Sequence, residues 1–448
     1  MQLLNKKDQT MGKGTTFIGQ PVLNQVVNLM SKDKINILAD EKGTDRYTKH
    51  LDSYTHLVIM LYAVLTNSSS LREVVLGFES NVSRMGHLGM DYLVRRSTLA
   101  DANKRRDPAF FEAVYDYLYR LYEPVLSDSR TKRELLDKLY VMDSTTISLF
   151  SEILKGVGRN PENGKKKGGI KAHTIIKYDI DIPMMVDYTA AAVHDHEQMG
   201  KILSLPSGSY IAFDMGYVDY YLWEQMTESC IKYVTRQKDN AKYRVVETRK
   251  AEGKDILSDE VIEVDYDKEI ERPITPEELS HRRGRRPKSG IIMVKERKKG
   301  VHRCRRIVKR TDDGKGTVAF ITNDFDLSAE EVCELYRRRW SVETLYKKVK
   351  QNFPLKYYLG DNENAIKIQI WVTMIAYLLM KVLQHKSKSK LAFSNLVTTV
   401  RITICSYTDI VMLLNNPTVE WEAYQKRRRE MLAANMEKYR QLDLFDDT

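Results

Sequence analysis

The sequence predicts a mixed α/β protein in which a sheet-bearing domain lies between two helical regions. Three observations predict this fold class. Apolar residues recur at helical spacing through most of residues 1–135. From Leu139 onward, short apolar runs bounded by turn residues replace that spacing, as is typical of strands. Beyond Gln351 the helical spacing returns and continues through residues 386–448.

Composition limits the class of partner. The 448 residues carry a formal net charge of +11, with a pI near 9.1, which favours a polyanion such as nucleic acid. The four cysteines are far apart, so we expect a reducing cytoplasm and neither a zinc site nor a disulfide framework. The N-terminus has no apolar signal segment, and the longest apolar runs, 57–65 and 370–380, are short for a membrane span. We therefore expect a cytoplasmic, nucleoid-associated protein without a membrane partner.

Residues 1–135 are expected to form a helical DNA-binding domain. Helices are predicted over 52–65, 70–78 and 108–126. Ser97 is placed to cap a further short helix, which ends in Lys104 and Arg105. A basic helix among other helices suits a helix-turn-helix reader of DNA with these two residues as contacts, and it equally suits a helical linker with a basic rim.

The middle of the chain is predicted to be one α/β domain with an insertion. We expect three antiparallel strands over residues 139–146, 170–177 and 184–192, followed by a helix over 196–203. A strand over 210–214, a helix over 217–228 and a strand over 231–235 come next, and a strand over 318–323 and a long helix over 328–353 follow the insertion. This order is typical of a ribonuclease-H-like catalytic domain. We expect its first part over residues 136–235 and its second part over residues 317–385.

The insertion, residues 236–316, is expected to be β-rich and strongly basic. From His281 to Arg310 it has 14 Lys and Arg against one acid, Glu296. Residues 294–309 are predicted to form a two-stranded ribbon that turns at Gly300. A solvated face or a disordered loop can also carry a charge run, but a run this unbalanced favours phosphate contact. The expected DNA contacts are Lys298, Lys299, Arg303, Arg305 and Arg306.

The helix predicted over 328–353 begins with a capping box made by Ser328 and Glu331. At 100° per residue, a stripe about 60° wide contains Tyr336, Arg339, Glu343 and Lys350. A carboxylate flanked by cations suits a metal ion beside a phosphodiester. On this helix alone, a solvated face with ordinary i,i+4 pairing explains the pattern as well.

Two aspartates supply partners for Glu343. Asp143 follows the apolar run LYVM, and Asp214 follows YIAF. Adjacent, poorly solvated carboxylates repel each other unless cations compensate, and Mg²⁺ prefers oxygen ligands of this kind. Either aspartate alone would be an ordinary strand-end acid. The three acids together predict a site for two Mg²⁺ ions, with Mn²⁺ as a substitute.

A family resemblance supports this site. The spacing Tyr336-x2-Arg339-x3-Glu343-x6-Lys350 resembles the YREK signature of bacterial cut-and-paste transposases, in the fourth insertion-sequence family of the DDE superfamily. Asp143 in MDSTTI and Asp214 in DMGY resemble that family's two aspartate motifs, and the resemblance covers roughly residues 90–385. It implies that Asp143, Asp214 and Glu343 form a two-metal site. This site would hydrolyse the inverted-repeat ends of an element and join their 3′-hydroxyls to target DNA.

The same resemblance implies DNA contacts and a dimer. Arg339 and Lys350 would hold phosphates near the cut, Tyr336 would assist them, and a homodimer would bridge two DNA ends. Trp340 matches an aromatic residue that can stack on a flipped base during hairpin formation, and ordinary helix packing is the alternative.

The hairpin route itself stays open. Family members that use it carry a second aromatic residue on the insertion, whereas this chain has no Trp between Trp223 and Trp340. Tyr243 or Tyr266 could take that place.

The chain ends in a charged helix and a short apolar motif. Four residues resemble the QLxLF peptide by which bacterial proteins bind the replicative sliding clamp: Gln441, Leu442, Leu444 and Phe445. A tail cannot easily bury these apolar side chains, which favours a partner. The alternative is a helix end that folds back on the C-terminal helix.

Together these patterns predict a metal-dependent DNA transposase that acts on double-stranded DNA. Two alternatives are a ribonuclease-H-like nuclease that cuts without strand transfer and an inactive, transposase-derived DNA-binding protein. The intact set of three acids favours an enzyme.

Overall fold

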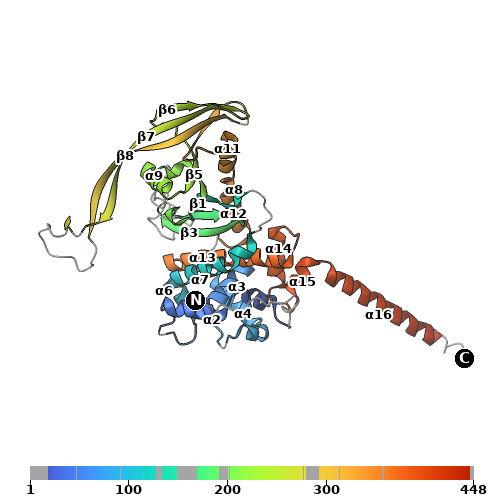
Figure 1. Cartoon of the computed structure of the whole chain (residues 1–448). Helices are drawn as coiled ribbons and strands as arrows, with labels where there is room; N and C mark the ends of the chain where they lie inside the picture. Colours follow the sequence, from blue (N-terminus) through green and yellow to red (C-terminus); the bar gives the residue numbers. More distant parts are fainter. Residues whose placement is uncertain are drawn as a thin grey trace, which may run out of the picture. The chain divides into compact units, whose positions relative to one another are not determined.

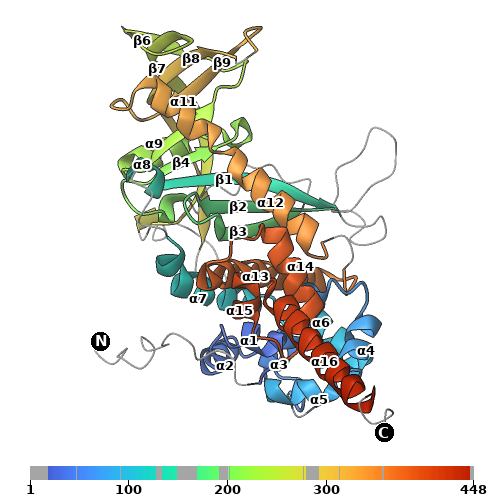
Figure 2. The same ribbon diagram turned by 90° about the vertical axis from the view of Figure 1, so that its right-hand side faces the viewer.

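In a computed structural model of the chain, the described residues are 19–46, 48–90, 92–127, 134–148, 169–190, 200, 202–275, 277–278, 292–311, 313–355 and 358–443. The chain divides into two compact units, one made of Met1–Leu126 with Lys347–Thr448 and the other of Ser127–Tyr346. The first unit is helical, and the second contains the sheet (Figure 1, Figure 2).

The helical unit combines the two ends of the sequence. Its N-terminal elements are α1 (Val22–Val27), α2 (Lys32–Glu41), α3 (Ser53–Thr66), α4 (Leu71–Glu79), α5 (Val82–Met85), the 3₁₀ helix η1 (Gly86–Leu88), α6 (Arg96–Arg105) and α7 (Ala109–Leu126). Its C-terminal elements are α13 (Glu363–Ser387), α14 (Phe393–Thr403), α15 (Ile410–Asn415) and α16 (Val419–Asp443). Helix α13 is central because it packs against α3, α6, α7, α14 and α15.

Capping residues explain where several of these helices begin. The side chains of Asp52 and Asn362 each accept a hydrogen bond from the backbone N–H three residues on, at the starts of α3 and α13. The cap expected at Ser97 is wrong, because α6 begins at Arg96 and Ser97 lies inside the helix. Helix α13 is long and apolar enough to cross a membrane, but 89% of its apolar window is buried inside the protein, as in a core helix.

The described strands of the second unit form one nine-stranded sheet. They are β1 (Leu139–Ser148), β2 (Gly169–Lys177), β3 (Ile182–Ala190), β4 (Tyr210–Phe213), β5 (Lys232–Arg236), β6 (Arg244–Arg249), β7 (Ile256–Pro273), β8 (Met293–Arg310) and β9 (Thr317–Thr322). Their order across the sheet is β3-β2-β1-β4-β5-β9-β8-β7-β6. Strand β4 is parallel to β1 and β5, and the other neighbours are antiparallel. The predicted antiparallel meander is confirmed as β1–β2–β3.

The strands of the insertion extend this sheet rather than form a separate one. Strand β9 pairs with β5 on one side and with β8 on the other. Strands β7 and β8 form a long ribbon (Figure 1). The predicted turn at Gly300 is wrong, because β8 runs through it and pairs with β7 along its whole length. Gly300 lies opposite Tyr266, and a Cβ there would come within 2.4 Å of the Tyr266 hydroxyl, so the glycine leaves room for that side chain.

The helices that pack on or lead into the sheet are α8 (Glu134–Asp137), the 3₁₀ helix η3 (Met215–Tyr217), α9 (Tyr220–Glu228), α11 (Ala329–Arg337) and α12 (Trp340–Asn352). The predicted capping box of Ser328 and Glu331 is present at the start of α11. The single helix predicted over 328–353 is wrong in one respect, because a turn at Arg338 and Arg339 separates α11 from α12. At this turn the N–H of Arg339 bonds to the carbonyl of Tyr336, a tighter spacing than in an α-helix.

The apolar core of the second unit anchors the long ribbon. The rings of Phe213, Trp223 and Tyr233 pack together, with Trp223 and Tyr233 centroids 4.9 Å apart. His302, on β8, is fully buried beside them, with Nε2 2.7 Å from the Tyr233 hydroxyl and Nδ1 2.7 Å from the Glu224 carboxylate. The base of the ribbon is therefore fixed to β5 and to α9.

Candidate active site

The register of the sheet brings Asp143 and Asp214 together. The last residues paired between the parallel strands β1 and β4 are Met142 and Phe213. Asp143 directly follows Met142 and Asp214 directly follows Phe213, so the two aspartates lie at the same level of the neighbouring strands. The strand predicted over residues 139–146 continues to Ser148, because β1 stays paired with β2.

The α11–α12 segment adds a glutamate, an arginine and a tyrosine to this pair. Arg339 is buried, its Nη1 donates to Asp143 Oδ2, and its Nη2 donates to Glu343 Oε1 at 3.1 Å. Tyr336 is also buried, and its hydroxyl makes a long hydrogen bond of 3.5 Å to Asp214 Oδ1. Arg339 therefore bridges Asp143 and Glu343, and Tyr336 contacts Asp214.

The electrostatics of this cluster show a shortage of positive charge. Burial raises the pKa of Asp143 to about 6 from an ordinary 3.8, Arg339 and the N–H of Ser144 oppose the rise, and Asp214 and Glu343 add to it. Burial acts to lower the pKa of Arg339, but the acids around it outweigh burial and raise it. Ionised Asp143 is thus unfavourable even beside Arg339, and a divalent cation would relieve this.

The donor chemistry fits a hard cation, but the present side-chain arrangement does not yet form a ligand set. Carboxylates from two strands and a helix are the oxygen ligands that Mg²⁺ prefers. Across the described ranges, no three His, Cys, Asp or Glu side chains are grouped so that they could hold a metal ion. The guanidinium of Arg339 bridges Asp143 and Glu343 instead. Metal binding by the three acids therefore requires Arg339 to turn away.

Trp340 and Lys350 lie on α12 in different surroundings. Trp340 begins the helix with 60% of its surface exposed, and its ring lies 5.7 Å from the Arg339 guanidinium carbon. Lys350 lies about two turns beyond Glu343 on the same helix, and burial lowers its pKa.

The two tyrosines considered as partners for Trp340 lie on the insertion. Tyr243 immediately precedes β6, is 38% exposed, and has the Arg306 guanidinium 5.0 Å above its ring. Tyr266 lies on β7, with its ring 6.0 Å from that of Tyr221.

Acids on β7 offset much of the positive charge on β8. In the register, Glu263, Asp267, Glu269 and Glu271 lie opposite Arg303, Lys299, Arg297 and Lys295. Ion pairs join Lys295 to Glu269 at 2.7 Å and Arg297 to Asp267 at 2.6 Å. The charge run alone therefore overstated the basic character of the ribbon, because its compensating acids belong to another part of the sequence.

The predicted DNA contacts of the insertion divide into buried and exposed residues. Arg305 is 3% exposed, and its Nε and Nη2 bond to the carboxylate of Asp259 at 2.9 and 2.6 Å, so it is a structural residue rather than a DNA contact. Arg306 is half-buried and donates to Glu260 and Gln237. The side chains of the remaining three predicted contacts reach solvent. Lys298 pairs with Glu296, Lys299 with Asp267, and Arg303 with Glu247.

The other predicted contacts lie in the helical unit. Lys104 and Arg105 are exposed at the end of α6, and Arg105 Nε lies 2.8 Å from Asp101. In the clamp motif, Leu444 and Phe445 and the side chains of Gln441 and Leu442 lie outside the described residues, so the motif stays a prediction.

Sequence patterns did not single out two residues beside the acids. Tyr346 is buried on α12, and its hydroxyl hydrogen-bonds to Thr174, which is paired with Asp143 across β1 and β2. The signal for it was its spacing, since Tyr346 lies three residues beyond Glu343 on one helix. Arg236 is exposed at the end of β5. Burial raises the pKa of Tyr336, and the nearby charge of Arg236 acts to lower it.

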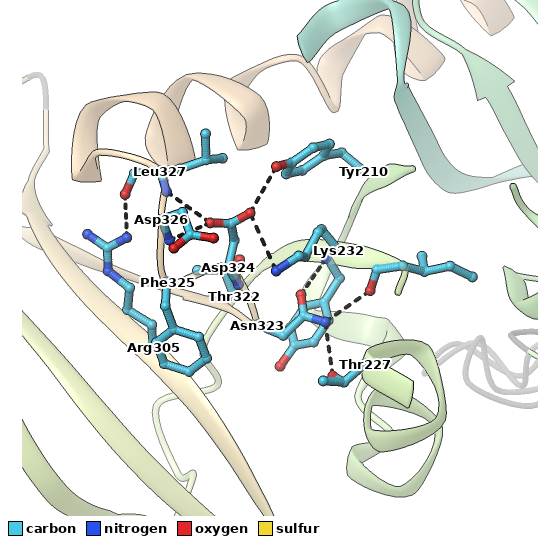
Figure 3. Close-up of polar contacts among 12 residues, drawn as sticks. Tyr210, Thr227, Lys232, Arg305, Thr322, Asn323, Asp324, Phe325, Asp326 and Leu327 are labelled. Carbon is cyan, nitrogen blue, oxygen red and sulfur yellow. Dashed lines mark hydrogen bonds and ion pairs between the residues drawn. The ribbon is translucent and has the colours of Figure 1, made fainter. Parts of the chain in front are cut away.

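A buried carboxylate fixes the loop between β9 and α11. Asp324 accepts hydrogen bonds from the N–H groups of Asp326 and Leu327 at 2.8 and 2.9 Å and from the Tyr210 hydroxyl at 2.9 Å (Figure 3). Burial acts to raise the pKa of Asp324, but these hydrogen bonds and Lys232, whose Nζ is 3.8 Å away, outweigh burial and lower it. The loop that leads into α11 is therefore tied to β4 and β5.

Arg305 joins the same loop to the ribbon. Besides its two bonds to Asp259 on β7, it donates to the carbonyl oxygen of Leu327 (Figure 3). The start of α11 is thus fixed on both sides, which positions Tyr336 two turns further on.

Comparison with known families gives the class of the chain, which is that of proteins with a DDE transposase domain. Within it, the chain belongs to the family described as Transposase DDE domain, which matches residues 134–379, more than half of its length. Residues 18–91 match a second family, described as Domain of unknown function (DUF4372). The protein is therefore a DNA transposase.

Similar proteins carry names of the same kind. The y4zB protein of Sinorhizobium fredii, named as a transposase, is 28% identical over 319 residues, which cover 70% of this chain and 75% of the relative. The transposase named for insertion sequence element IS5377 in Geobacillus stearothermophilus is 26% identical over 62% and 66% of the two chains. The one named for IS4SA in Synechocystis is 23% identical over 74% and 82%.

One solved structure also aligns with the chain. The cryo-EM structure of the piggyBac transposase synaptic complex with hairpin DNA covers 89% of this chain and 82% of its own, at 12% identity and a TM-score of 0.39.

Proposed function

We propose that the chain hydrolyses the inverted-repeat ends of an insertion sequence and joins the freed 3′-hydroxyls to target DNA. The observation that supports this proposal is that buried Arg339 bridges Asp143 and Glu343, while the charge of Asp214 also acts on the same guanidinium. Carboxylates placed in this way are suited to binding a cation, and the chain belongs to a transposase family.

In this proposal, Asp143, Asp214 and Glu343 hold two Mg²⁺ ions, with Mn²⁺ as a substitute. Bound Mg²⁺ supplies Lewis-acid activation of the attacking oxygen and stabilises the leaving oxygen. Arg339, released from the acids, donates its planar N–H groups to phosphate oxygens near the cut. Tyr336 donates its hydroxyl to Asp214 and so helps to orient that carboxylate.

Trp340, Lys350 and Arg236 extend the proposed contact with DNA. The exposed ring of Trp340 offers a stacking surface for a base beside the scissile phosphate. Lys350 and Arg236 supply further positive charge for the backbone. Whether the cut passes through a hairpin depends on an aromatic partner for Trp340, for which Tyr243 and Tyr266 are the two candidates.

Three finer assignments belong to the same proposal. The strand order β3-β2-β1-β4-β5 supports a ribonuclease-H-like catalytic core. The spacing of Tyr336, Arg339, Glu343 and Lys350 supports membership of the fourth insertion-sequence family. A homodimer that bridges the two element ends would place both cuts in one complex.

The test is cleavage and joining of a duplex that carries the element's own end, in Mg²⁺. Wild type is expected to give cut and joined products, and Glu343→Gln is expected to lose both by more than about 100-fold. The control is Glu228→Gln, because Glu228 is an exposed acid at the end of α9. Equal cleavage by wild type and Glu343→Gln would remove Glu343 from the site.

The same assay separates the alternatives. A nuclease would give the cut product but no joined product, even when the ends are supplied already cut. An inactive DNA-binding protein would give neither product while still binding the duplex.

A further inference from the structure

A basic cavity in the helical unit is separate from the site described above. Its volume is about 630 Å³, and it lies between the loop that follows α2 and one side of α6. The residues that define its chemistry are Lys42, Arg46, Lys49, His50, Tyr92 and Arg105. Its size is within the range of sites that hold small ligands or one nucleotide unit.

Positive charge predominates in this cavity. Five cations line it against two acids, namely Lys42, Arg46, Lys49, Arg105 and Arg106 against Asp101 and Asp107. Arg105 pairs with Asp101 at 2.8 Å. Among the residues that the structure describes, no acid pairs with the ammonium group of Lys42 or Lys49. A concave surface with an excess of unpaired cations attracts anions.

The wall of the cavity is fixed before any ligand arrives. Arg106 is buried, and its Nη2 donates to the carbonyl oxygen of Leu51 at 2.8 Å and to Asp45 at 3.3 Å. Asp45 in turn accepts a hydrogen bond of 2.8 Å from the Ser53 hydroxyl. These bonds hold the loop against α6, so binding would require little ordering of the backbone.

Two aromatic rings also line the cavity. The rings of His50 and Tyr92 stack, with centroids 5.2 Å apart and planes 19° apart. Rings beside cations offer apolar surface to the sugars of a DNA backbone whose phosphates the cations hold.

We propose that this cavity binds the phosphodiester backbone of double-stranded DNA, with Lys42, Lys49 and Arg105 on phosphate oxygens and the His50–Tyr92 pair against the adjoining nucleotide. The proposal rests on the proposed action of the chain on DNA. It gives a role to the region matched as a domain of unknown function, since Lys42, Lys49 and His50 belong to that region and line one wall. The other wall is α6, whose exposed Arg96 and Lys104 add positive charge on the same helix.

The experiment measures binding of the full chain to two short duplexes, one with the element's end and one of unrelated sequence, across a salt series in EDTA. Lys42→Gln/Lys49→Gln is expected to bind both duplexes about 10- to 100-fold more weakly, because phosphate contacts carry no sequence information. The slope of log K against log salt is expected to fall in magnitude by about 1.8. The matched control is Lys34→Gln/Lys386→Gln, which removes two exposed lysines of the same unit from outside the cavity.

The outcomes separate this proposal from the proposed function. If Lys42→Gln/Lys49→Gln and the control have equal salt slopes and unchanged unfolding midpoints, the cavity proposal is overturned. The proposed transposition reaction is not affected by that result. A second contrary result is that a deoxynucleoside monophosphate stabilises wild type but not Lys42→Gln/Lys49→Gln against heat, while the two proteins show the same slope of log K against log salt for DNA. That result would overturn the cavity proposal and identify a free nucleotide as the ligand. A reduced slope together with absent cleavage by wild type supports the cavity and counts against the proposed reaction. Absence of any DNA binding by wild type overturns both.

Discussion

Replacing Asp143 by Asn should stabilise the metal-free protein at neutral or higher pH. The pKa of Asp143 in the folded chain is about 6, against an ordinary 3.8, and this difference already includes the favourable effect of Arg339. A rise of about two units corresponds to an unfavourable free energy of about 3 kcal/mol for ionised Asp143. Asn has nearly the same shape and no charge, so Asp143→Asn should gain up to about 3 kcal/mol at pH 8.

The sign of the pH dependence gives a second check on the same prediction. An acid whose pKa is raised by folding makes the folded state lose stability as the pH rises from 3.8 to about 6. The advantage of Asp143→Asn should therefore be absent below the ordinary pKa, grow through this window and stay constant above it.

Urea unfolding in EDTA, followed through Trp223 in the core of the same unit, measures this difference. Asp239→Asn, at an exposed position of the same unit, is the control and should change stability by less than about 0.5 kcal/mol. The desolvation argument fails if Asp143→Asn is no more stable than wild type at pH 8, or if its advantage is the same at pH 3.

Metal addition should remove most of the stability difference between the two proteins. Saturating Mg²⁺, at about 100 times its dissociation constant, should stabilise wild type by about 2.7 kcal/mol. It should leave Asp143→Asn nearly unchanged, because that variant lacks one of the proposed ligands. Equal stabilisation of both proteins would place the ion elsewhere.

Two further predictions concern the loop before α11 and the aromatic residue after it. Asp324→Asn should destabilise the second unit by about 1–3 kcal/mol, because Tyr210 and Lys232 lose a charged acceptor. This loss of unfolding free energy should become smaller as the pH falls below 3.8 toward the lowered pKa of Asp324. Urea unfolding beside the exposed control Asp326→Asn measures it, and equal stability of the two variants would contradict it. Trp340→Ala should leave unfolding within about 0.5 kcal/mol of wild type but weaken binding of cut ends by about 1–3 kcal/mol, and Trp340→Phe should restore most of it. Unfolding made easier by more than about 1 kcal/mol would instead indicate packing.

Local features of the sequence predicted local features of the structure. The side chains of Ser328, Glu331 and Asp52 mark helix starts because a cap depends on residues within one turn. The acids of the site were identifiable because Asp143 and Asp214 follow apolar strands and Glu343 lies in a spaced motif.

Features that depend on distant partners could not be predicted in this way. Arg305 looked like a DNA contact until β7 placed Asp259 beside it, although the two residues are 46 positions apart in the sequence. The turn at Arg338 and Arg339 interrupts a stretch with unbroken helical periodicity, so no local signal marked it. The helices at the two ends of the chain share one unit through α13, a consequence of long-range packing alone.

The position of β9 has a consequence for how the protein is made. Strand β5 obtains its second neighbour only from β9, about 80 residues later in synthesis, after the whole insertion has left the ribosome. A product truncated before Thr317 would expose β5 as an open sheet edge, the kind of edge that promotes aggregation, and would also lack the helices bearing Arg339 and Glu343. Damaged copies of the gene that end in the insertion should therefore yield insoluble, inert fragments rather than shorter proteins that compete for DNA ends.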